Sequence, residues 1–188
     1  MTAQQPDLFI YKGKEYSLIG VDGRELFDPA DYNIQPTMVS TACYRGYVCT
    51  YSISEDYLVL KNLQIRTDKP REINKKKPEK GKTGFSHEYS NLDLKIDFTG
   101  SLLIGKGFIQ EMYVHMGFQR PISFETVREL YFEKGQLKEE KNLSKLMAKK
   151  RQDDPHKDSQ PDYQSGEDTR SWIEKAFSLD FDLKNEKD

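Results

Sequence analysis

The sequence predicts an all-β protein, mainly an antiparallel meander arranged as a barrel-like sheet or a sandwich, with short C-terminal helical segments. Three observations indicate this class. Apolar and polar residues alternate from Asp7 to about Glu140, glycine-containing turns interrupt the alternation at short intervals, and no helical pattern separates the expected strands. We therefore expect a single all-β domain over residues 1–144 and a tail over residues 145–188.

Two hairpins are predicted by their turn residues. Residues 9–19 turn around Gly13, because glycine readily adopts the positive φ of a tight turn. Near the end of the domain, residues 125–132 and 136–140 are the arms of a second hairpin that turns at residues 133–135.

Three further segments have the period-two pattern of strands. Residues 56–65 form one of them, and residues 92–98 form another in which every second side chain is apolar. The third segment is 108–118, where Glu111, Tyr113 and His115 share one side and apolar residues share the other.

Residues 69–88 interrupt the strands with a segment rich in Lys, Pro and Gly, which we predict to be a mobile basic loop. Seven Lys or Arg and two Glu lie between residues 69 and 82, although the whole chain has a formal net charge of −2. Clustered lysines can contact phosphates, but no aromatic side chains alternate with them, so we do not expect nucleic-acid binding.

The tail over residues 145–188 is acidic, since residues 151–188 hold eleven Asp or Glu against six Lys or Arg. Residues 152–167 have almost no apolar content and are predicted to be disordered. An amphipathic helix is expected near residues 169–178. The candidate contacts to a protein partner are three apolar side chains of this helix and one aromatic side chain beyond its end: Trp172, Ile173, Phe177 and Phe181. The same helix can instead cover an edge of its own domain.

The stretch STACYRGYVCTYSIS, residues 40–54, holds both cysteines and a candidate ligand site. Cys43 and Cys49 are predicted to be buried, unreactive thiols, because only Arg45 supplies positive charge nearby. Arg45 between Tyr44 and Tyr47 has the chemistry to bind an anion and stack on an aromatic ring. A hairpin-tip arginine exposed to water is the simpler interpretation.

Glu111, Tyr113 and His115 are the one set with acid–base potential, because a strand would present carboxylate, phenol and imidazole in a row. The same row is typical of the wet face of an amphipathic strand. No His and Cys spacing indicates a metal site, and we expect no cofactor. The sequence has no export signal and no membrane-spanning apolar run, so we expect a cytoplasmic protein.

The motifs STACYRGYVCTYSI, GFIQEMYVHMGF and VRELYFEKGQL resemble those of an uncharacterised family of small, stand-alone bacterial proteins. The resemblance covers residues 7–144 and implies a bacterial cytosolic origin. It implies no activity.

We expect a non-enzymatic binding or interaction protein, with an adaptor or immunity-like role, that contacts a protein partner through its tail. Two alternatives stay open. One is a small hydrolase or transferase that uses Glu111, Tyr113 and His115, with Arg45 as an anion clamp. The other is a β-barrel that carries a small apolar ligand.

Overall fold

The computed structural model describes residues 2–153 and 169–180 and has one mixed ten-stranded sheet. The strands are β1 (Leu8–Tyr11), β2 (Lys14–Asp22), β3 (Tyr47–Ser54), β4 (Tyr57–Ile65), β5 (Glu79–Lys80), β6 (His87–Tyr89), β7 (Leu94–Lys95), β8 (Gly100–Phe108), β9 (Phe124–Glu133) and β10 (Gln136–Asn142). Three short 3-10 helices and the helices α1 (Ser144–Asp153) and α2 (Thr169–Ala176) complete the described elements. The predicted all-β class with C-terminal helical segments is confirmed.

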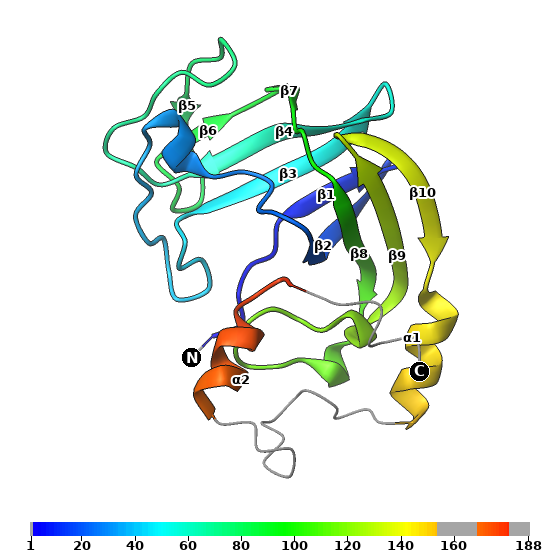
Figure 1. Ribbon diagram of the computed structural model, residues 1–188. Helices are drawn as coiled ribbons and strands as arrows, with labels where there is room; N and C mark the ends of the chain where they lie inside the picture. Colours follow the sequence, from blue (N-terminus) through cyan, green and yellow to red (C-terminus); the bar gives the residue numbers. More distant parts are fainter. Residues whose placement is uncertain (1, 154–168, 181–188) are drawn as a thin grey trace.

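The sheet curls into an open ring (Figure 1). Nine of its strands follow the order β10-β9-β8-β2-β1-β3-β4-β6-β5, and the tenth, β7, pairs with β4 off this path. β10 returns to β4 through a single residue pair, Gln136 with Tyr57. One pair cannot close the sheet along its length, so the structure is neither a barrel nor a two-sheet sandwich. Between the strands that the structure describes, every pairing is antiparallel except that of β1 with β3.

Both predicted hairpins are confirmed. β1 and β2 join at Lys12 and Gly13, whose φ angles are 49° and 72°. β9 and β10 join at Lys134 and Gly135, with φ angles of 49° and 79°. These positive φ values explain why both turns contain glycine.

Two apolar layers stabilise the curled sheet. Alternate residues of a strand face opposite sides, so Leu102 and Ile104 join the large cluster inside the curl, whereas Leu103 joins a smaller cluster outside it. The outer cluster is covered by α1, through the fully buried Met147. The largest fully buried side chains of the inner cluster are the aromatic residues Phe9, Tyr51, Tyr89, Phe98 and Phe132.

The prediction of one regular strand over residues 92–98 is wrong, although its side-chain pattern is partly right. Leu92, Ile96 and Phe98 are buried as expected. Only β7 forms a strand there, because Asp93 has a φ of 45° and leaves the extended conformation.

The strand predicted over residues 108–118 is also wrong. β8 ends at Phe108, and residues 110–112 form a 3-10 helix. The side chain of Gln119 makes the two backbone hydrogen bonds to Val114 that a neighbouring strand would otherwise make. Its Oε1 accepts from the Val114 N–H at 3.0 Å, and its Nε2 donates to the Val114 carbonyl at 2.9 Å. Residues 109–123 therefore form a folded loop, which we call the 109–123 loop.

The basic segment 69–88 is attached to the sheet at several points. Ile73 and Phe85 are buried, and the Tyr89 hydroxyl donates to the Arg71 carbonyl at 2.6 Å. The lysines of the segment are exposed, and the segment lies at the end of the sheet where β5 and β6 are found (Figure 1).

Candidate functional site

Arg45 lies in the turn before β3 and binds groups of its own chain. Its guanidinium forms an ion pair with Asp7, and its Nε donates to the Tyr47 carbonyl at 2.9 Å. The predicted stacking is also present, because the guanidinium carbon lies 4.6 Å from the centre of the Tyr47 ring. The third residue of the predicted set, Tyr44, is exposed.

The carboxylate of Asp7 connects this turn to the interior. Asp7 is buried, and its Oδ1 accepts a 2.6 Å hydrogen bond from the Cys49 N–H. Burial disfavours the charge of Arg45, but the attraction of Asp7, together with contributions from Cys49 and Tyr47, outweighs that effect and raises the pKa of the guanidinium. An external anion would have to compete with Asp7 for Arg45, so the geometry favours a structural role for this pair.

The two cysteines are free and buried. Cys43 lies in the turn rather than in a strand, and its thiol contacts the Tyr47 carbonyl at 3.6 Å, whereas Cys49 lies within β3. Burial raises the pKa of both thiols. Both therefore stay protonated and are poor nucleophiles or metal ligands.

Glu111, Tyr113 and His115 lie on the 109–123 loop, and all three are exposed. The rings of Tyr113 and His115 meet edge to face at 5.0 Å. Within the described residues, His115 has no hydrogen bond to a carboxylate. The three side chains therefore do not form a catalytic row.

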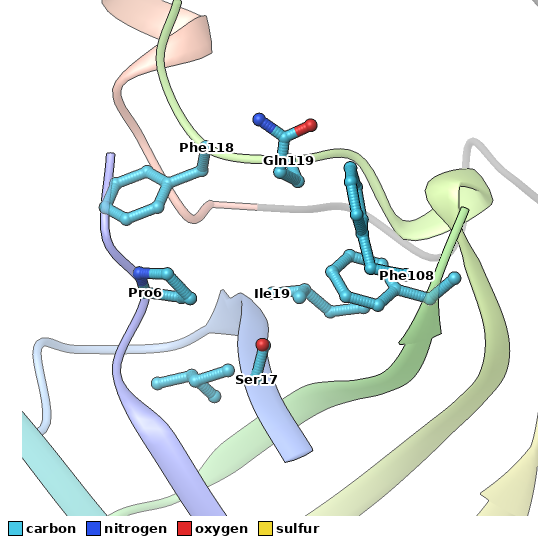
Figure 2. A pocket seen from close by; sticks show the side chains of 8 residues that line it. Pro6, Ser17, Ile19, Phe108, Phe118 and Gln119 are labelled. Atoms are coloured by element: carbon cyan, nitrogen blue, oxygen red, sulfur yellow. The ribbon is translucent and has the colours of Figure 1, made fainter. Parts of the chain in front are cut away.

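An apolar cavity of about 190 Å³ lies on the outer face of the sheet (Figure 2). The N-terminal segment, β2, the end of β8, the 109–123 loop and the start of β9 all contribute to it. Its walls include Pro6, Ser17, Ile19, Phe108, Phe118 and Gln119. Sequence reasoning missed this cavity because its walls come from segments far apart in the chain.

Phe108 connects the cavity to the surface. Its ring meets Phe124 at 5.5 Å and Tyr113 at 6.4 Å, both edge to face. Phe108 and Tyr113 have 36% and 37% of their area exposed. We call Phe108, Tyr113 and His115 the aromatic face.

The tail helix α2 lies against its own domain (Figure 1). The Phe118 N–H donates to the Ala176 carbonyl at 2.9 Å, and the Val21 N–H donates to the Leu179 carbonyl at 2.7 Å. Among the predicted partner contacts, Ile173 is half-buried and Phe177 is exposed. Trp172 belongs to α2, and Phe181 and most of the predicted disordered segment lie outside the described residues.

Other site types find little support in the described part of the chain. No three His, Cys, Asp or Glu side chains gather there as metal ligands would. Across residues 2–153 and 169–180, no helix has both the length and the apolar character to cross a membrane.

The fold and site define a mostly β protein with an exposed aromatic face beside a small apolar cavity. Comparisons of the chain with protein-family models, curated proteins and solved structures found no match. The resemblance to an uncharacterised bacterial family is not tested by these comparisons and stays a prediction.

Proposed function

We propose that the chain is a non-enzymatic binding protein, adaptor-like or immunity-like, whose aromatic face contacts a protein partner. The observation that carries this proposal is that the exposed rings of Phe108, Tyr113 and His115 contact one another in sequence beside an apolar cavity. Aromatic side chains are enriched among the residues that dominate binding energy, and binding residues often lie on loops that a rigid sheet supports.

The cavity supports the same proposal through its size. At about 190 Å³ it is smaller than the ~300–1,000 Å³ of most small-molecule sites, so it suits a single apolar side chain of a partner better than a whole ligand. The inner side of the sheet, where a ligand-carrying barrel would hold its cargo, is filled by the large apolar cluster. The carrier alternative therefore has less support.

The enzyme alternative requires groups that converge on one reacting atom. Glu111, Tyr113 and His115 are instead spread over an exposed loop, and Arg45 is bound to Asp7 in another part of the molecule. A binding role needs no such convergence and no cofactor. We also propose a cytoplasmic location, following the expectation from the sequence.

The test is a quantitative pull-down from a lysate of the cells that produce the protein. Tyr113→Ser/His115→Ser changes the aromatic face without touching the walls of the cavity, and Tyr131→Ser is the matched control because Tyr131 is also 37% exposed but lies on β9. We expect one stoichiometric partner with wild type and with the control, and affinity about 10- to 100-fold lower for the double variant. Equal retention by all three proteins, or no partner, would overturn the proposal.

A further inference from the structure

One side of β2 is only partly paired. β8 pairs with β2 from Ser17 to Asp22, but on the other side β1 pairs only with residues 14–17. The Leu18 N–H still reaches the Asp7 carbonyl, at 2.8 Å. Among the strands that the structure describes, none pairs with β2 on this side beyond Leu18, which leaves room there for a further segment.

The segment Ala176–Asp180 of the chain's own tail lies at this open edge. Val21 donates its N–H to the Leu179 carbonyl, and Val21 and Asp180 form a parallel bridge. The side chain of Leu179 packs against the large inner cluster. Residues 179–180 are thus held beside β2 by one backbone hydrogen bond, one bridge and one apolar anchor, shortly after α2 ends at Ala176.

The other end of this segment is held by the 109–123 loop. The Ala176 carbonyl accepts from the Phe118 N–H, and Gly117 lies directly against Ala176, since a Cβ at Gly117 would lie 2.0 Å from the Ala176 oxygen. This close approach of the Ala176 backbone explains why position 117 is glycine. The Ala176 Cβ would lie 3.0 Å from the same added Cβ, so the peptide side chain at this position lies close to the loop, which favours a small residue. The two contacts together select a small residue followed, three positions later, by an apolar residue.

We propose that the β2 edge and residues 117–118 form a binding site for a short peptide of a partner protein that ends a helical turn and continues beside β2, as the tail does, with a small residue at the Ala176 position and a leucine-like residue at the Leu179 position. The tail occupies this site in the free protein and competes with the partner. The inference rests on the proposed function, because it names the class of partner. The 109–123 loop connects the two surfaces, since it carries Tyr113 and His115 of the aromatic face as well as Gly117 and Phe118.

The tail gives the proposed site a built-in competitor. A tethered segment has a high effective concentration, so a separate peptide binds the wild-type protein weakly even where the site itself fits it well. Releasing the tail should therefore expose a site that the same peptide can fill from solution.

The experiment uses full-length protein with Leu179→Asp, which removes the apolar anchor and adds a charge. Met38→Asp is the control, because it makes an equivalent change at an exposed apolar side chain outside the tail. The probe is a fluorescein-labelled peptide of residues 169–180, measured by fluorescence anisotropy. Hydrogen exchange at the Val21 and Phe118 amides reports whether the site is occupied.

In Leu179→Asp we expect both amides to exchange faster and the peptide to bind at least about tenfold more tightly than to wild type or to Met38→Asp. Bound peptide should restore protection, and a peptide that carries Leu179→Asp should not bind. Fast exchange of both amides without peptide binding at about 1 mM peptide would mean that the tail contact is only structural, and it would overturn the inference. Unchanged protection in the variant would also overturn the inference. Neither readout involves a partner, so failure here is distinct from failure of the pull-down.

Discussion

Replacing Arg45 with methionine should destabilise the protein strongly. In the native structure Asp7 is buried, and its charge is balanced by the Arg45 guanidinium, while its Oδ1 also accepts from the Cys49 N–H. Arg45→Met keeps much of the side-chain length and removes the charge. The variant therefore leaves the Asp7 carboxylate buried with a backbone hydrogen bond but without its cation.

The expected loss follows from how deeply the pair is buried. Removing one partner of a buried ion pair costs about 3–5 kcal/mol. The Arg45 side chain is 29% exposed, so water can partly replace it, and we expect about 3 kcal/mol. For a chain of this size that free energy corresponds to a fall in Tm of roughly 6–12 °C.

The assay is urea unfolding of wild type, Arg45→Met, Asp7→Asn and the double variant. Asp7→Asn should cost less, about 1–2 kcal/mol, because the amide oxygen still accepts from the Cys49 N–H and Arg45 still reaches water. The double variant should lose less than the sum of the single losses, since no unpaired charge stays buried.

Two results would refute this reasoning. The first is a loss below about 1 kcal/mol for Arg45→Met with an unchanged m-value, which would mean that the charge of Asp7 needs no partner. The second is a rise in the Tm of wild type with phosphate, at constant ionic strength, that Arg45→Met abolishes. That result would support the anion-clamp interpretation of Arg45 instead.

Two further predictions concern titratable groups. Burial raises the pKa of Glu140, but hydrogen bonds from Lys12 and Tyr11, each 2.7 Å, outweigh that effect and lower it below its ordinary 4.5. Glu140→Gln should therefore lower the free energy of unfolding by about 1 kcal/mol at pH 7, measured by urea unfolding. This difference between wild type and variant should shrink as the pH falls below 4.5 through the lowered pKa of Glu140 in the folded protein. A difference that stays constant with pH would contradict the linkage. Cys43 and Cys49 should resist a thiol reagent in folded protein and react in urea, and rapid labelling of the native state would show that burial does not protect them.

The sequence predicted those parts of the fold that local chemistry determines. The turns at Gly13 and Gly135 were predictable because a positive φ selects glycine, and the arms beside them carry a clear alternation. The burial of Leu92, Ile96 and Phe98 was predictable from the same alternation of apolar and polar residues. The extent of β7 was not, because strand length depends on which neighbour supplies hydrogen bonds, and β4 pairs with only two residues there.

Two predictions depended on side-chain contacts that the local pattern does not show. The alternation in residues 108–118 is real, yet Gln119 binds both backbone groups of Val114 and folds the segment into a loop. Likewise, the charge of Arg45 beside two tyrosines indicated a candidate anion site, but its guanidinium is bound by Asp7, which lies 38 positions earlier in the chain. A pattern within a short window cannot report a contact across that separation.

The 109–123 loop is the element on which the functional argument converges. Because it leaves the sheet between β8 and β9, it carries Tyr113 and His115 to the surface, and it places Phe118 in the wall of the cavity. Its backbone at Gly117 and Phe118 also binds the N-terminal segment, through Gln4, and the tail, through Ala176. A regular strand would have directed these groups along the sheet instead. The departure from strand geometry is therefore what assembles the aromatic face, the cavity and the tail contact at one end of the molecule.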